Sequence, residues 1–153
     1  KMAISSGIAI KWKELAMGGH LPSIVPGYAG FKIALYSSLA TLTNATSLYS
    51  AALPGEISAS TGGVSTNYTA GGNVCTVLSV DVDGSVAYMQ FADQTWTCAT
   101  FAADGCLIYN TSTSTANRTI AVIDFGGTKT ATNGTFTITM PAAGATTSIV
   151  RLA

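Results

Sequence analysis

Hydrophobic and polar residues alternate along several stretches of this chain with a period of two, which is the period of a β-strand. From 135 to 140, threonine alternates with phenylalanine, isoleucine and methionine, which predicts a strand with one apolar and one hydroxylated face. Phe31–Tyr36 (FKIALY) predicts a second strand, in which Phe31, Ile33 and Leu35 point to one side. These stretches indicate half-buried strands.

The stretch 119–140 organises the rest of the chain, because the other strands need its apolar residues to pack against. Residues 119–125 are β-branched and apolar enough for a buried strand, with Asp124 facing away from the core. Gly126-Gly127 is predicted to end this strand, and Asn133-Gly134 to form a turn, because both residues tolerate positive φ. The sequence therefore predicts two strands here, the second ended by Pro141.

A β-hairpin is predicted between residues 74 and 93. Residues 74–82 form the incoming strand, residues 86–91 the outgoing strand, and Asp83-Gly84-Ser85 the turn. A three-residue loop places apolar residues opposite apolar residues, so this register is preferred. It sets Val82 opposite Val86 and Val80 opposite Tyr88.

Further strands are predicted around Trp96, at 101–109 and at 148–152, with 56–59 as another candidate. Short strands separated by turn residues, with no convincing helix after residue 20, are typical of an all-β fold. We therefore expect residues 31–153 to form a single antiparallel β-sandwich or jelly-roll-like domain.

Residues 1–30 are distinct from this pattern and form an N-terminal arm or short helix with a linker. Ile8, Trp12, Leu15 and Ala16 fall near helical spacing, and Gly18-Gly19 is a plausible helix end. A short amphipathic helix and an extended arm both fit. The apolar face must dock on the chain's own sandwich or on a neighbouring subunit.

Charge is scarce in this chain. Charged residues make up 9% of the sequence against roughly 25% in an average soluble domain, and the net charge is zero. Near-zero net charge favours association, so much of the surface is expected to be interface. The chain has no basic patch for nucleic acid, and no apolar run approaches the roughly 18 residues that suggest a membrane helix.

The sequence offers little catalytic chemistry, so we expect no enzyme activity, no cofactor and no metal site. The single histidine, His20, lies in a Gly-Gly-His loop, the seven acids are scattered, and no nucleophile, phosphate-binding or zinc motif is present. Asp81-x-Asp83-Gly84 lacks the spacing of a calcium loop and is better explained as turn chemistry.

Three cysteines, Cys75, Cys98 and Cys106, do not form a CxxC pair. Cys98 and Cys106 can bridge only if their strands are adjacent. The preferred interpretation is three small buried hydrophobic residues.

Four blocks of the chain together resemble a family of small virion proteins of tailed bacteriophages. The blocks are FKIALY at 31–36, YTAGG at 68–72, DQTWT at 93–97 with LIYN at 107–110, and AVIDFG at 121–126 with NGTFTI at 133–138. They span most of the chain. The N-terminus and the loop from 37 to 59 depart from the family pattern.

The resemblance implies a structural protein of the virion, most simply a decoration (cement) protein on the capsid surface that binds and stabilises the lattice of the major capsid protein. It also implies a homo-oligomer, with a trimer favoured and a dimer possible. We expect residues 1–30 and the adjoining loop to contact the capsid protein or a sister subunit. The candidate interface residues are Ile8, Trp12, Leu15, Leu39, Leu42 and Leu48.

Three other functions remain open at this stage, of which a hydrolase is the least favoured. A neck, tail or fibre-associated virion protein would use the same sandwich. A carbohydrate-binding module would present Trp96, Tyr68 or Tyr109 on an exposed face to stack against sugar rings.

Overall fold

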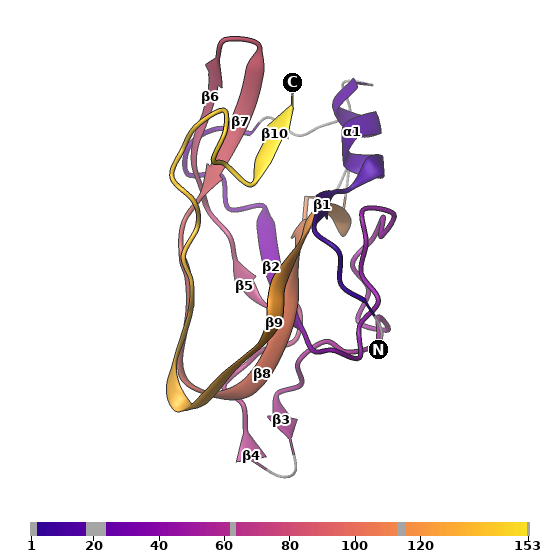
Figure 1. Cartoon of the computed structure of the whole chain (residues 1–153), viewed down its shortest axis with the longest axis vertical. Coiled ribbons are helices and arrows are strands. Elements are labelled where there is room, and N and C mark those ends of the chain that lie inside the picture. The colour runs from indigo at the N-terminus through magenta and orange to yellow at the C-terminus, as the bar shows by residue number, and fades with distance from the viewer. Residues whose placement is uncertain (1–2, 18–23, 62–63, 113–115, 153) are drawn as a thin grey trace.

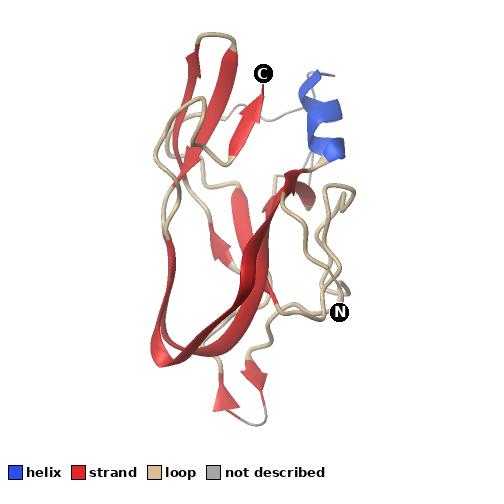
Figure 2. Cartoon of the chain, viewed as in Figure 1, coloured by secondary structure: helices blue, strands red, loops and turns tan. Residues whose placement is uncertain are grey.

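Two antiparallel sheets pack against each other as a β-sandwich, which confirms the predicted fold class (Figure 1). The computed structural model describes residues 3–17, 24–61, 64–112 and 116–152. Figure 2 shows that strands and loops make up almost all of this part, with one short helix, α1 (Ile10–Met17).

The larger sheet has the strand order β1-β9-β8-β2-β5 and the smaller sheet the order β10-β7-β6. The strands of the larger sheet are β1 (Gly7–Ile8), β2 (Phe31–Tyr36), β5 (Asn73–Val74), β8 (Gln94–Asn110) and β9 (Arg118–Ile138). The strands of the smaller sheet are β6 (Val77–Asp83), β7 (Val86–Phe91) and β10 (Val150–Leu152). A separate ribbon pairs β3 (Ser60–Thr61) with β4 (Val64–Ser65).

Strand β9 is continuous over 21 residues, so the prediction of two strands joined by a turn was wrong. Gly105 pairs with Asp124 and Ala103 with Lys129, so residues 125–128 of β9 lie opposite Asp104 alone. Gly126 and Gly127 have φ of 69° and 136°, and they form a bulge instead of ending the strand. Sequence could not separate the two outcomes, because a bulge and a turn use the same positive-φ residues.

Asn133 also lies in a bulge and not in a turn, with φ of 47°. The bulges let the β8–β9 ribbon curve, as Figure 1 shows at its lower end. Beyond the bulge, the threonine side of β9 is exposed, while Phe136 and Met140 are buried and Ile138 is half-buried, as the alternation predicts. Asp124 is exposed, also as predicted.

The β6–β7 hairpin (residues 77–91) has a two-residue loop, Gly84-Ser85, so the predicted three-residue loop was wrong by one position. Gly84 has φ of 60°, and glycine at the first loop position suits a type II′ turn. Both faces of the hairpin tip are exposed, so placing apolar residues opposite each other there gains little free energy. The glycine therefore determines the register. The opposed pairs are Asp83 with Val86, Val82 with Ala87, and Val80 with Met89.

Residues 74–82 do not form one strand as predicted. The chain crosses between the sheets here, since β5 pairs with β2 and β6 pairs with β7. Cys75 and Val77 are fully buried at the crossing. The predicted strand is thus divided into β5 and β6, with the buried Cys75 and Val77 at the crossing.

The N-terminal segment contains both predicted alternatives, a short extended piece and a helix, and it packs on its own sandwich. Strand β1 pairs Gly7 with Val122 of β9, and α1 follows directly. Trp12 of α1 is 1% exposed and meets Phe31 edge-on, with ring centroids 6.0 Å apart and planes at 75°. Of the two docking sites left open by the sequence, the helix therefore occupies the one on its own sandwich, and Trp12 is part of the core. The predicted helix end at Gly18-Gly19 lies outside the described residues.

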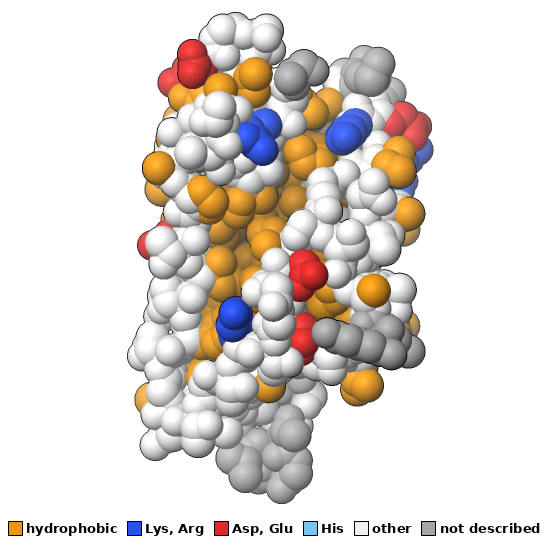
Figure 3. All heavy atoms as spheres, viewed as in Figure 1, with side chains coloured by type: hydrophobic (Ala, Val, Ile, Leu, Met, Phe, Trp, Pro, Cys, Tyr) orange, Lys and Arg blue, Asp and Glu red, His pale blue; other side chains and the backbone are white. Residues whose placement is uncertain are grey.

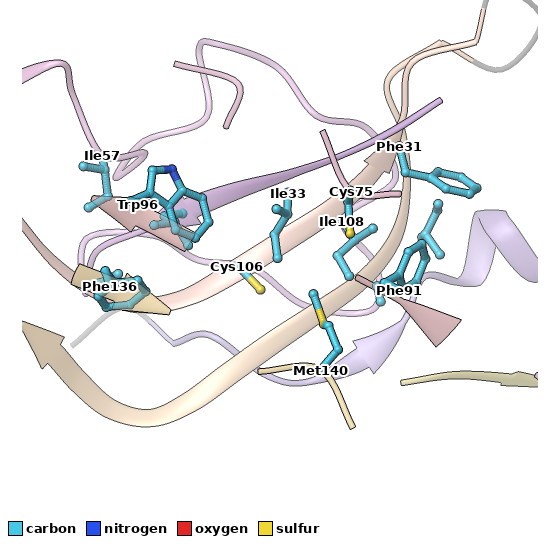
Figure 4. Close-up of a cluster of buried hydrophobic side chains, with 14 of the residues drawn as sticks. Phe31, Ile33, Ile57, Cys75, Phe91, Trp96, Cys106, Ile108, Phe136 and Met140 are labelled. Atoms are coloured by element: carbon cyan, nitrogen blue, oxygen red, sulfur yellow. The ribbon is translucent and has the colours of Figure 1, made fainter. Parts of the chain in front are cut away.

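The main core lies between the two sheets, and Figure 4 shows its side chains converging from β2, β7, β8 and β9. Phe31, Ile33 and Leu35 face this core, as predicted. Ala34 and Tyr36 on the opposite side of β2 are also fully buried, because the loop 37–53 covers that face. The larger sheet is thus covered on both faces at β2.

Candidate functional site

Polar and titratable side chains converge most closely around Glu56, which bridges the loop before β3 and the YTAGG segment. Its Oε1 accepts hydrogen bonds from the Tyr68 hydroxyl at 2.9 Å and the Gly71 N–H at 2.5 Å. Its Oε2 accepts one from the Tyr49 hydroxyl at 3.0 Å. Glu56 therefore ties three separate points of the chain together.

Two further contacts complete this tyrosine cluster. The Tyr68 hydroxyl accepts a hydrogen bond from the Leu35 N–H of β2 at 3.0 Å, so one phenol serves as donor and acceptor. The Tyr109 hydroxyl donates to the Gly71 carbonyl at 2.8 Å, and its ring stacks on Tyr49 at 4.2 Å with planes 9° apart. The cluster joins the first strand of the core to the segment that precedes β5.

The phenols of this cluster are held neutral. Burial raises the pKa of Tyr68, and the Glu56 carboxylate raises it further. Burial and the same carboxylate raise the pKa of Tyr109 to about 12. The Tyr68 hydroxyl donates to Glu56 and the Tyr109 hydroxyl donates to the Gly71 carbonyl, so the neutral phenols hold the segments together and the cluster is a structural lock.

The YTAGG segment has a second structural reason for its composition. Gly72 has φ of +72°, and a Cβ at this position would overlap the carbonyl oxygen of Ile33. Glycine is therefore required for the close approach to β2. The segment that carries part of the family resemblance is explained by packing, and no ligand is needed to account for it.

The predicted interface residues divide into buried and exposed sets. Trp12 and Leu42 are buried in their own chain, and Ile8 is half-buried in its pairing with β9. Leu39 is 65% exposed and Leu48 is also exposed, both in the loop after β2. The side chain of Leu15 is outside the described part of the structure. Trp12 and Leu42 are therefore not available as surface contacts in this structure, whereas Leu39 and Leu48 are.

The three rings proposed to stack on sugars are not available for that role. Trp96, Tyr68 and Tyr109 are all buried. Trp96 lies among Tyr68, Phe101 and Phe136, with ring centroids 6.1 to 6.5 Å away. The carbohydrate-binding interpretation loses the residues on which it depended.

The cysteines differ from the prediction of three buried residues. Cys75 and Cys106 are buried, but Cys98 is exposed in a bulge of β8 with φ of 50°. All three are free thiols, so Cys98 and Cys106 do not pair. Burial raises the pKa of the Cys75 thiol to about 12, which keeps it protonated and unreactive.

Within the described residues, no group of three or more His, Cys, Asp or Glu side chains is placed to hold a metal ion. The same part of the chain contains one ion pair, Lys11 to Glu14 on the surface of α1 at 2.6 Å. His20 lies outside the described residues.

In the described part of the chain, no helix is long and apolar enough to cross a membrane.

A surface that the sequence analysis missed is the row of exposed apolar residues on β6. Leu78, Val80 and Val82 are 50%, 43% and 64% exposed on the last strand of the smaller sheet. The hairpin extends at one end of the long axis of the molecule (Figure 1). Valine alternates with aspartate at 80–83 in the sequence, which predicts a strand but does not say that its valine face is exposed.

Comparison of the chain with models of known protein families, with curated proteins and with solved structures gave no match.

Proposed function

We propose that this protein is a structural component of a tailed-phage virion, most simply a decoration protein on the capsid surface. The observation that carries the proposal is the exposed apolar row Leu78, Val80 and Val82 on a projecting hairpin. Contiguous exposed apolar surface on a folded domain marks an interaction site. The polar cluster around Glu56 is a structural lock, which supports attachment more than catalysis.

The low charge of the surface supports the same role. A decoration protein covers a repeating lattice, so many weak, identical contacts give strong overall attachment without any single strong site. A net charge of zero lets neighbouring copies approach without repulsion. The sandwich core and the Glu56 lock supply the rigidity that such a lattice requires.

The proposed contact surface differs from the one expected from sequence. Residues 7–17 include strand β1 and helix α1, which pack on their own core, so the N-terminal segment is not a free arm there. The hairpin row takes over the main role, and Leu39 and Leu48 remain as candidate contacts. The major capsid protein is the proposed partner, and the alternative within the same class is a neck, tail or fibre position.

The copy number in purified virions tests the proposal. Quantitative mass spectrometry should give this protein in a fixed ratio to the major capsid protein, with hundreds of copies per particle. A handful of copies would instead select the neck or tail position. Absence from washed virions would refute the virion role.

A further inference from the structure

One face of the smaller sheet has a gap in its side chains near the hairpin. Strand pairing aligns one residue from each of β6, β7 and β10 in a row: Val80, Met89 and Val150. The next row towards the hairpin tip consists of Val82, Ala87 and Leu152. The small side chain of Ala87 stands at the centre of this second row, where the first row has a methionine, so the face is hollowed there.

An apolar hollow of about 150 Å³ lies at this gap. Trp12 of α1 and Ile24 line it together with residues of the sheet. The complete lining is Trp12, Ile24, Val80, Ala87, Tyr88, Met89, Val150 and Leu152. We call it the α1–sheet hollow. None of its lining residues is charged.

The α1–sheet hollow opens to solvent on the hairpin side. Val80 is 43% exposed and Ala87 is also exposed, whereas Trp12 and Met89 are buried. Val82, in the same row as Ala87, extends the apolar surface towards the hairpin tip. Figure 3 shows hydrophobic side chains reaching the surface in the region between the hairpin and α1. The hollow is therefore a recess in the exposed apolar surface of the hairpin.

The charged side chains of the three strands point to the other face of the sheet. Asp81 pairs with Tyr88 and Asp83 with Val86, one position out of step with the rows that line the hollow. Arg151 also pairs with Tyr88 and shares their face. A charged occupant of the hollow would lose its hydration and gain no partner from these strands. The group that fits is therefore uncharged and apolar.

The volume of the hollow sets the size of its occupant. An engineered protein cavity of about 150 Å³ lined by leucine, isoleucine and phenylalanine stays dry and binds benzene. The α1–sheet hollow has a similar volume and an apolar lining. It can therefore hold one group of about the size of benzene, such as the ring of a phenylalanine or the branched end of a leucine.

We propose that the α1–sheet hollow is an anchor site, which takes one phenylalanine or leucine side chain of the partner protein. In protein interfaces, a few anchors in well-packed pockets carry most of the binding energy, and the contacts around them exclude water. The hollow is the pocket, and Val80 and Val82 are the apolar surround. The occupant is a side chain of a partner because the hollow opens on the hairpin row already proposed as the attachment surface. The inference rests on the proposed function for the identity of that partner.

A titration with benzene tests the hollow in the purified protein. Benzene should shift the methyl NMR signals of Met89 and Val150 in a saturable way. At about ten times its Kd, it should also raise the folding equilibrium constant by about tenfold. Benzoate is the matched control, because it adds a charge to the same ring and should do neither. A protein that does not respond to benzene would overturn the proposal.

Filling the hollow tests its role in attachment. Ala87→Leu should abolish the benzene response and weaken attachment to capsids that lack the protein by about tenfold or more, because the anchor loses its place. Ala102→Leu is the matched control, because Ala102 is also an exposed alanine of a strand but lines a different hollow. It should keep both properties. Circular dichroism and melting temperature check that each variant is folded.

Competition gives the same test without a variant. Saturating benzene should weaken attachment of the wild-type protein by about tenfold, because it occupies the place of the anchor. Benzoate at the same concentration should leave attachment unchanged. Attachment that persists when benzene fills the hollow would overturn the proposal, whatever the folding of Ala87→Leu.

The inference and the proposed function fail in different ways. If benzene fills the hollow but neither benzene nor Ala87→Leu weakens attachment, the anchor site is refuted and the decoration role stands. Absence of the protein from washed virions refutes the proposed function and removes the virion partner with it, even where benzene fills the hollow.

Discussion

Replacing Trp12 with alanine tests whether the N-terminal helix belongs to the core of its own chain. Trp12 is 1% exposed and packs edge-on against Phe31. It also borders an apolar hollow with Ile24, Met89 and Val150, so its removal enlarges an existing cavity between α1 and the smaller sheet. The variant should therefore be strongly destabilised.

The expected loss follows from burial. Truncating a buried Trp to Ala costs about 3–5 kcal/mol of unfolding free energy, which includes the lost transfer energy and the cavity. Domains are stable by only about 5–15 kcal/mol, so this is a large fraction of the total. For a chain of this size, the melting temperature should fall by roughly 6–20 °C.

Chemical denaturation followed by Trp96 fluorescence measures this loss, since Trp96 is then the remaining tryptophan. Leu39→Ala is the control, because an exposed leucine away from the core should change stability by about 0.5 kcal/mol or less. A loss below about 1 kcal/mol for Trp12→Ala would contradict the account. It would mean that α1 does not dock on its own sandwich, and docking on a neighbour would return as the explanation.

Three further predictions follow from the polar cluster and the thiols. Tyr68→Phe should lower the unfolding free energy by about 1–3 kcal/mol in chemical denaturation, because the buried Leu35 N–H loses its acceptor. Tyr88→Phe on the hairpin is the control and should lower it by about 0.5 kcal/mol or less. The free energy of unfolding should fall as pH rises from about 10 to about 12. Tyrosines of the unfolded chain ionise in this range, while Tyr109, with its raised pKa, stays neutral in the folded state. Unchanged stability across this window in pH-dependent melting would contradict the lock. A thiol reagent should label Cys98 alone in the native protein and all three cysteines after denaturation. Cys98→Ser is the control and should abolish native labelling. Labelling of more than one native thiol would show that the core is open.

Sequence patterns predicted the parts of the fold that depend on burial. FKIALY is strand β2 with the expected residues, and the alternation at 135–140 gave the correct buried face. These predictions hold because side chains alternate between the two sides of a strand and only one side is buried. A shift by one residue would expose the apolar side chains, so a single register is favourable. The all-β sandwich follows from the same pattern repeated along the chain.

The errors at the two bulges of β9 share one physical cause. Gly126-Gly127 and Asn133 permit positive φ, and local sequence does not say whether that conformation makes a turn or a bulge. At the hairpin tip, no buried face fixes the register, so the position of Gly84 determines it. The length of β9 and the exposure of the valines on β6 can be predicted only when the strand partners are known.

The candidate site was the least predictable part. The Glu56 lock joins residues that are 7 to 15 positions apart through loops without regular pattern. Glu56 had been assigned to a possible short strand, and the YTAGG segment was known only from its resemblance.

The most direct test of the virion role is to mix the purified protein with capsids that lack it and to image the particles by electron cryomicroscopy. The account predicts density at regularly repeated lattice positions, with the β6–β7 hairpin in a contact with a neighbouring copy or with the capsid protein. Capsids that remain bare at saturating protein concentration would contradict it.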